Sequence, residues 1–218
     1  EDAIDVAAGK VAGWSIFDGK AGKQIALLKS GTVVGTTRGK VVSELYKVGK
    51  AIGEGAFGFV RVAQQRLSKE LVAVKTFEKN RLRDASARRR LDNEIRVLQR
   101  VRHPHIVRLF ETFESPKRIH LVMEYVSHGT LYRHLKKHKK LAEPEARRLF
   151  RQLVGALAYL HSRFISHRDI KLENVLLDHR RDVRLIDFGF AILSRSKLRV
   201  PCGSPSYTAP EIVAHKEY

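Results

Sequence analysis

The chain has 218 residues, of which 43% are hydrophobic and 8% aromatic, a composition that excludes an intrinsically disordered protein. No run approaches the ~20 apolar residues that a membrane-spanning helix needs. The formal net charge of +19 favours acidic partners such as nucleic acid, anionic membranes or phosphorylated proteins. Cys202 is the only cysteine, which excludes an intrachain disulfide and fits a cytoplasmic protein, with the nucleus as the alternative.

The positive charge gathers in two runs, one over residues 79–102 and one over residues 133–140. Solvated helix faces are the simplest interpretation of such runs, and an acidic or phosphorylated partner for the first run is the alternative. Nucleic-acid binding would be better supported by a recognition motif, such as aromatic stacking platforms between the basic residues, and the sequence shows none. We therefore do not expect nucleic acid as a partner.

Residues 1–43 are rich in Gly, Lys, Ala and Thr and predict a flexible extension or a few weak strands. Gly-Lys pairs recur in this segment, but Ser or Thr follows none of them. A phosphate-binding P-loop is therefore excluded here.

Residues 45–77 alternate like strands, for example at Val60 and Val62. Residues 84–101 predict a helix with Asp84 as its N-cap, and residues 106–110 and 119–124 predict two more strands. Pro144 suits the first turn of a long helix whose apolar stripe, from Ala146 to Leu160, predicts buried core. Residues 175–177 and 183–186 predict a hairpin. This order indicates an α+β fold with two lobes.

A glycine-rich segment, GEGAFGFV, runs from Gly53 to Val60. Glycines let backbone N–H groups approach phosphates that a side chain would keep away. Turns and dinucleotide-binding folds use the same spacing, but in a dinucleotide fold the third glycine opens a helix. Gly58 is instead followed by a strand-like stretch. The segment therefore favours a glycine-rich hairpin lying over a nucleotide.

Lys75 closes the apolar strand Val72-Ala73-Val74, about 20 residues after the glycines. A lysine on a central strand is costly unless it is paired, and Glu94 on the following helix is the natural partner. A surface lysine and a surface glutamate are the alternative, which the preceding glycine loop makes less favourable.

Three more motifs follow in order: HRDIKLEN from His167, DFG from Asp187 and APE from Ala209. With the glycine loop and Lys75, they resemble the signature set of the eukaryotic protein-kinase superfamily. The resemblance covers about residues 45–218. Lys171 and the segment around Ser204 are similar to the serine/threonine type. Within that type the chain looks most similar to calcium/calmodulin-dependent and AMP-activated-like kinases.

The resemblance implies a two-lobed kinase fold that binds ATP and Mg²⁺. Its small antiparallel β lobe would carry one helix, and its mainly helical large lobe would be truncated. The implied catalytic residues are Asp169, which orients the acceptor hydroxyl and takes its proton, Lys171 at the γ-phosphate, and Lys75 fixed by Glu94. Asn174 and Asp187 would hold the metal. The implied nucleotide-binding residues are Gly53, Glu54, Gly55, Ala56, Phe57, Gly58, Val60, Ala73, Lys75, Met123, Glu124, Val126 and Leu176.

The resemblance further implies that Leu98, Leu109, His167 and Phe188 stack as an internal spine, and that Ser204 contacts Asp169 and Lys171. It divides the chain into an extension (1–43), a small lobe with hinge (44–126) and a partial large lobe (127–218). The large lobe is expected to be incomplete because the family has further helices after the position of Tyr218.

The chain departs from the family at the activation segment. Val200 stands where many relatives carry a phosphorylatable threonine whose phosphate binds the arginine that matches Arg168. We expect the segment to be ordered without phosphate, by packing of Val200 and by large-lobe residues that follow Tyr218 in the family, and phosphorylation of Ser194 or Ser196 is the alternative. Thr130 replaces an acidic residue that reads basic substrates in many relatives.

Three function classes follow. The leading hypothesis is a protein serine/threonine kinase that transfers the γ-phosphate of ATP to Ser/Thr hydroxyls of proteins. The alternatives are a nucleotide-binding regulatory scaffold without activity, and a basic nucleic-acid-binding module, which would explain the charge but not the motifs.

Overall fold

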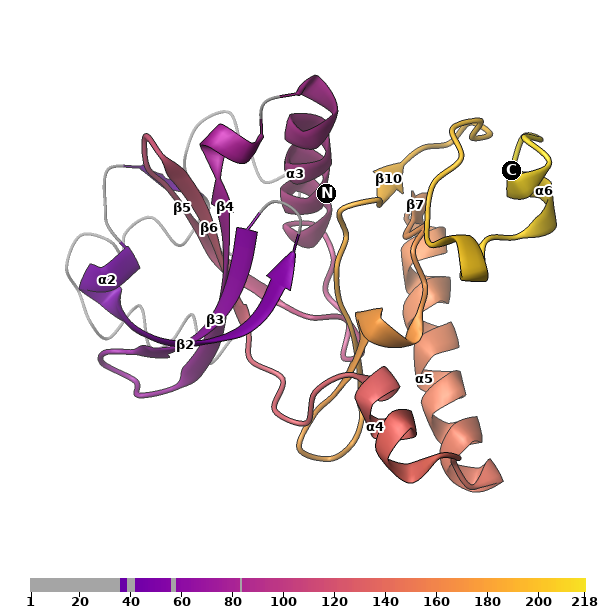
Figure 1. Cartoon of the computed structure of the whole chain (residues 1–218), viewed down its shortest axis with the longest axis horizontal. Coiled ribbons are helices and arrows are strands. Elements are labelled where there is room, and N and C mark those ends of the chain that lie inside the picture. The colour runs from indigo at the N-terminus through magenta and orange to yellow at the C-terminus, as the bar shows by residue number, and fades with distance from the viewer. Residues whose placement is uncertain (1–35, 39–41, 56–57, 83) are drawn as a thin grey trace. The chain divides into compact units, whose positions relative to one another are not determined.

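The structure is a computed structural model that describes residues 36–38, 42–55, 58–82 and 84–218 (Figure 1). The chain divides into two compact units. Of the described residues, those up to Ala85 and those from 108 to 125 form one unit, and residues 86–107 and 126–218 form the other. None of the helices in the described ranges is long and apolar enough to cross a membrane.

The first unit is built on one six-stranded sheet in the order β1-β5-β6-β4-β3-β2. Neighbouring strands pair antiparallel except β1, which pairs parallel with β5. The sheet is rich in the β-branched and aromatic residues that fit a pleated surface. Its strands are Thr36–Arg38 (β1), Tyr46–Gly55 (β2), Gly58–Gln65 (β3), Leu71–Glu78 (β4), Leu109–Glu114 (β5) and Arg118–Glu124 (β6).

The core of the first unit lies against one face of this sheet. The short helix α2 (Val42–Leu45) delivers Val42 to a buried cluster that also contains Tyr46, Ala63, Val72, Val74, Phe113 and Val122. The Tyr46 and Phe113 rings meet edge to face, with centroids 6.2 Å apart. The Tyr46 hydroxyl donates a hydrogen bond to the buried carboxyl of Glu111. The 3₁₀ turn η3 (Lys79–Arg81) follows β4.

The second unit is mainly helical. Its helices are α3 (Ala85–Leu98, within this unit from Ser86 on), α4 (Leu131–His138), α5 (Glu143–Ser162) and α6 (Pro210–Val213). Two small antiparallel sheets pair β7 (Ile165–Ser166) with β10 (Ile192–Leu193) and β8 (Val175–Leu177) with β9 (Val183–Leu185). The 3₁₀ turns are η4 (Leu172–Asn174) and η5 (Pro205–Tyr207). A sheet in one unit and helices in the other confirm the predicted α+β plan.

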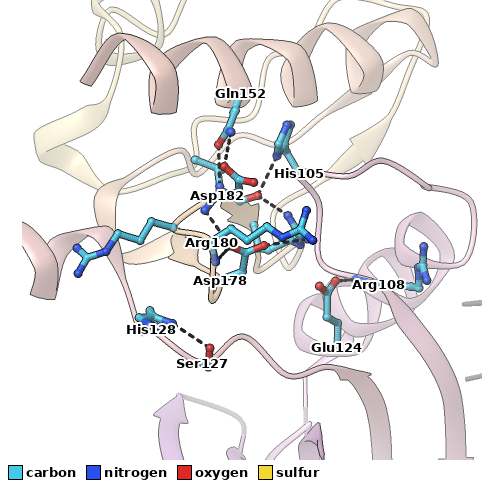
Figure 2. A network of polar contacts seen from close by, with 12 residues as sticks. His105, Arg108, Glu124, Ser127, His128, Gln152, Asp178, Arg180 and Asp182 are labelled. Atoms are coloured by element: carbon cyan, nitrogen blue, oxygen red, sulfur yellow. Dashed lines mark hydrogen bonds and ion pairs between the residues drawn. The ribbon is translucent and has the colours of Figure 1, made fainter. Parts of the chain in front are cut away.

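Helix α5 holds the turn between β8 and β9 through Asp182, as Figure 2 shows. Gln152 donates to the Asp182 carboxylate at 2.6 Å and accepts from the Val183 amide at 2.9 Å. The hydrogen bond from Gln152 is the largest of several causes that lower the pKa of Asp182. Asp178 accepts from the amides of Arg180 and Asp182 inside the turn. The hairpin that carries Leu176 is therefore fixed to the long helix.

The predicted strand over residues 106–110 is wrong in its position. The strand β5 begins at Leu109, while Ile106 forms an isolated parallel bridge with Leu185 and the Val107 amide donates to the Leu185 carbonyl at 2.9 Å. Ile106 and Val107 are apolar because they are buried in the second unit, not because they continue the sheet of the first.

The apolar stripe of α5 is only partly buried, which corrects the prediction of a fully buried stripe. Leu149 and Leu160 are buried together with Ala156, whereas 67% of Phe150 and 45% of Val154 are exposed. The buried positions face one side of the helix, and α5 packs against β7 and β9. Phe150 and Val154 lie one helical turn apart and form an exposed apolar pair.

Candidate active site

The glycine-rich segment forms the hairpin between β2 and β3. Gly53 pairs with Val60, Glu54 with Phe59 and Gly55 with Gly58. A Cβ at Gly58 would lie 1.8 Å from the carbonyl oxygen of Thr76, so only glycine lets β3 approach β4 this closely. Ala56 and Phe57 lie outside the described residues. The prediction of a glycine-rich hairpin, rather than a helix opened by Gly58, is confirmed.

Lys75 and the predicted adenine-side residues share the centre of the same sheet. Lys75 stands opposite Val60 on β3, and Ala73 stands opposite Met123 on β6. Ala73 and Met123 are each 8% exposed, and the Lys75 ammonium lies 5.1 Å from the centroid of the Phe77 ring. Register and burial therefore bring these residues together within the first unit.

Glu124, at the end of β6, is held by the start of β5. Its amide donates to the Arg108 carbonyl at 2.9 Å, and its carboxylate accepts from the Arg108 amide at 3.3 Å (Figure 2). Both hydrogen bonds tie the end of β6 to the start of β5 and so fix the backbone at Glu124. Val126 and the half-buried Leu176 belong to the second unit, as does Glu94, so the pairing of Glu94 with Lys75 stays a prediction.

Asp169 is the centre of a buried hydrogen-bonded cluster in the second unit. Its Oδ2 lies 2.9 Å from the Lys171 ammonium and accepts from the Asn174 amide at 2.9 Å. Its Oδ1 accepts from the Ser204 hydroxyl at 2.9 Å, and Lys171 donates to the same hydroxyl at 2.9 Å. Asn174 also donates to the Asp169 carbonyl at 2.8 Å. The contact of Ser204 with Asp169 and Lys171 is confirmed.

The cluster places a carboxylate, an ammonium and a hydroxyl within hydrogen-bond reach of one another. Asp169 is 4% exposed, so its carboxylate acts in a site from which water is largely excluded. Because Lys171 and Asn174 share Oδ2, the side chain is fixed in one orientation. Such an arrangement suits the orientation of an acceptor hydroxyl and the uptake of its proton.

His167 holds the backbone next to Asp169 in place. Its Nε2 donates to the Ile186 carbonyl at 3.0 Å, which assigns the proton to Nε2 and leaves Nδ1 to accept from the Asp169 amide at 3.3 Å. Burial lowers the pKa of His167, so the ring is neutral. It meets the Phe188 ring edge to face at 4.8 Å between centroids. This is one contact of the predicted spine, and its members Leu98 and Leu109 are also buried.

The carboxyl groups of Asp187 and Glu94 converge on Gly189. A Cβ at Gly189 would lie 3.4 Å from Asp187 Oδ1 and 3.9 Å from Glu94 Oε2. Asp187 adopts a left-handed backbone conformation, with φ of 62°. Both hydrogen bonds that the side-chain nitrogen of Asn174 donates go to Asp169. The side-chain oxygen of Asn174 is therefore the atom that could bind a metal ion. A carboxylate oxygen with an amide oxygen is a donor set that Mg²⁺ prefers.

The activation segment differs from the expectation. Val200 is 70% exposed, so the predicted packing of its side chain is wrong. Arg168 instead donates to the Phe190 carbonyl at 2.8 Å and to the Tyr218 hydroxyl at 3.3 Å. Sequence reasoning missed Tyr218 because it belongs to no motif. Thr130 caps α4, since its hydroxyl accepts from the Arg133 amide at 3.1 Å.

Comparisons with known proteins agree with this site. The family model described as the protein kinase domain matches residues 46–218. Similar proteins include a "Serine/threonine-protein kinase SIK3 homolog" of Danio rerio, 42% identical over 79% of this chain and 15% of its own length. Others are "CBL-interacting serine/threonine-protein kinase 1" of Arabidopsis thaliana (40% identity, 79% of this chain, 40% of that protein) and "SNF1-related protein kinase catalytic subunit alpha KIN12" of the same plant (38%, 84% and 38%).

The chain thus spans less than half of the length of these relatives. The family model alone covers more than two thirds of the chain, and it includes every motif from the glycine-rich hairpin to Glu211. The predicted resemblance to serine/threonine protein kinases, of the AMP-activated-like group in particular, is confirmed. The chain belongs to the protein kinase family.

Proposed function

We propose that this chain is the catalytic region of a protein serine/threonine kinase that transfers the γ-phosphate of ATP to hydroxyl groups of proteins. The observation that carries the proposal is the buried cluster of Asp169, Lys171, Asn174 and Ser204. Phosphoryl transfer depends mainly on positioning and on charge stabilisation, and this cluster supplies both.

Asp169 accepts the proton of the acceptor hydroxyl, and Lys171 carries positive charge toward the transferred phosphoryl group. In the structure the Ser204 hydroxyl already makes both of these contacts, at 2.9 Å each. A serine or threonine side chain can therefore be oriented by the same two groups. This geometry supports the serine/threonine type.

The glycine-rich hairpin (Gly53, Glu54, Gly55, Ala56, Phe57 and Gly58) covers the phosphates, and Lys75, paired with Glu94, binds them. Val60, Ala73, Met123, Glu124, Val126 and Leu176 form the adenine pocket. Gly58 supports this assignment, because the contact of β3 with the Thr76 carbonyl excludes any side chain there. Backbone N–H groups in a glycine-rich hairpin of this kind can bind phosphate without a cation.

Asp187 and Asn174 would hold Mg²⁺, which when bound would neutralise charge on the phosphates. Asn174 supports this role because Asp169 holds its amide nitrogen, which orients the amide oxygen. The neutral His167 keeps the intervening backbone in place through its bonds to Ile186 and Asp169. The metal ligands and the catalytic carboxylate are thus coupled through one set of hydrogen bonds.

We propose residues 44–126 as the small lobe with its hinge and residues 127–218 as part of the large lobe, preceded by an extension of residues 1–43. The two compact units of the structure divide the chain differently, because residues 86–107 belong to the same unit as residues 126–218. Protein substrates and ATP are the partners, in the cytoplasm or the nucleus. An acidic or phosphorylated protein is a further partner for the basic helix region. On α3 the exposed residues include Arg88, Arg89, Arg90 and Arg96, which supports that assignment.

The test is phosphoryl transfer by the full-length protein to peptides whose only hydroxyl is Ser, Thr or Tyr. We expect turnover with Ser and Thr peptides. Asp169→Asn should lower kcat by roughly 10²–10⁴-fold, the usual share of a general base. Asp92→Asn, the same change at an exposed position of α3, should leave kcat unchanged.

Nucleotide binding without turnover in the wild-type protein would favour the regulatory scaffold. Near-normal turnover of Asp169→Asn, or of Lys75→Met, would contradict the proposed roles. Preference for the Tyr peptide would contradict the serine/threonine type. Each result is read against the Asp92→Asn control.

A further inference from the structure

Two stretches of the second unit are joined beside the segment from His167 to Asn174, which we call the catalytic loop. Leu198 and Tyr218 exchange two backbone hydrogen bonds, of 2.7 and 3.0 Å. Arg199 and Glu217, the next residues inward, form an ion pair. Residues 198–199 thus pair with residues 217–218 in the manner of a short antiparallel ladder. We call this contact the segment clamp.

The Tyr218 side chain extends the clamp to the catalytic loop. Its hydroxyl donates to the Val200 carbonyl at 2.8 Å and accepts from the Arg168 guanidinium at 3.3 Å. The Cys202 sulfur lies 3.8 Å from the same oxygen. Burial raises the pKa of Tyr218, so the phenol keeps its proton and remains a donor. One hydroxyl therefore joins three points of the chain.

Arg168 connects this hydroxyl to the reacting groups. It directly precedes Asp169, and its backbone is left-handed with φ of 67°. Gly203 packs on the Arg168 backbone so closely that a Cβ there would lie 2.8 Å from the Arg168 carbonyl oxygen. Ser204 follows Gly203 and contacts Asp169 at 2.9 Å. Residues 200–204 are thus held at one end by Tyr218 and at the other by Asp169.

We propose that Tyr218 is a positioning residue of the kinase reaction, whose hydroxyl holds residues 200–204 on Arg168 and so sets Ser204 against Asp169 and Lys171. This proposal rests on the proposed function. The clamp needs no modification of residue 200, because it binds the Val200 backbone and not its side chain. A hydrogen bond from arginine to the hydroxyl gives the segment an anchor without phosphate.

The serine alternative has less support in the structure. The Ser194 hydroxyl donates to the Ser196 carbonyl at 3.0 Å and accepts from the Ser196 amide at 3.1 Å. These bonds close a local turn within the segment. The Arg168 guanidinium instead donates to the Phe190 carbonyl and to the Tyr218 hydroxyl.

The test compares Tyr218→Phe with Tyr132→Phe in the full-length protein. Tyr132 is 43% exposed on α4 and loses the same hydroxyl in the control. Trypsin reports on the segment directly, because Arg195 and Lys197 are exposed cleavage sites next to the clamp and Arg199 is an exposed cleavage site within it. The second readout is kcat and KM for a serine peptide and for ATP, and the third is Tm.

For Tyr218→Phe we expect cleavage in residues 195–199 to rise about fivefold and kcat to fall about fivefold, the effect of roughly one net hydrogen bond. The KM for ATP should stay close to wild type, and the Tm should fall by no more than a few degrees. Tyr132→Phe should match wild type in all readouts. Because the clamp acts through Arg168, Arg168→Lys and Tyr218→Phe should be non-additive in kcat.

If Tyr218→Phe lowers the Tm but leaves kcat and the cleavage rate unchanged, Tyr218 has only a structural role, and the proposal is overturned. Faster cleavage with unchanged kcat would overturn it as well, because the segment would then be held for another purpose. Proteolysis does not require turnover. If the wild-type protein lacks activity but the cleavage difference persists, the clamp stands while the proposed function fails.

Discussion

Replacing Glu111 by Gln tests the buried polar pair of the first unit. Glu111 is 3% exposed and accepts a hydrogen bond from Tyr46, which is fully buried. Its second carboxyl oxygen, Oε2, has no hydrogen-bond partner among the described residues. Burial raises the pKa of Glu111 from 4.5 to about 7, and the bond from Tyr46 only partly opposes this. The folded chain therefore favours the protonated acid.

The sign of the pH dependence follows from proton counting. Between pH 4.5 and about 7 the folded chain keeps a proton on Glu111 that the unfolded chain has released. The free energy of unfolding should therefore fall as the pH rises through this window, by about 1.4 kcal/mol per pH unit and about 3 kcal/mol in total. Glu111→Gln cannot titrate and should lose this dependence.

The assay is urea denaturation at pH 5 and pH 8, followed by circular dichroism. Wild type should lose about 2 to 3 kcal/mol more than Glu111→Gln between the two values, because pH 5 already lies above the lower end of the titration window. Glu70→Gln, a change at an exposed turn of the same unit, should keep the wild-type slope. Equal slopes in wild type and Glu111→Gln would refute the raised pKa as the source of the dependence.

Two further predictions concern packing. Gly58→Ala should lower Tm and raise the KM for ATP, because its Cβ would lie 1.8 Å from the Thr76 carbonyl oxygen. Gly155→Ala on α5 is the control. Its Cβ would meet nothing within 4 Å, so this change should stabilise the chain by about 0.5–1 kcal/mol. An unchanged Tm in Gly58→Ala would contradict this. The exposed pair Phe150 and Val154 should make the 218-residue chain self-associate with rising concentration, and Phe150→Ser should reduce the sedimentation shift. A monomer at all concentrations would contradict that reading.

The contacts of the Asp169 cluster could be predicted from the sequence because most of its members lie in one short motif. Asp169, Lys171 and Asn174 are separated by a few residues, so local backbone geometry brings them together. Ser204 is 35 residues from Asp169, and the family resemblance supplied that contact. The strand at 106–110 failed because a short apolar run is typical of any buried segment, and Ile106 is buried beside Leu185 in the other unit.

The error at Val200 has a more general physical cause. We predicted that the Val200 side chain packs in place of a phosphorylated threonine, but that side chain is mostly exposed. The structure uses its carbonyl, which accepts from Tyr218, and every residue type carries that group. Residue 200 is then free to vary, while the hydroxyl at residue 218 is the group whose loss should be felt. Patterns of side chains cannot reveal an anchor made by the backbone, because the sequence at the anchored residue carries no trace of it.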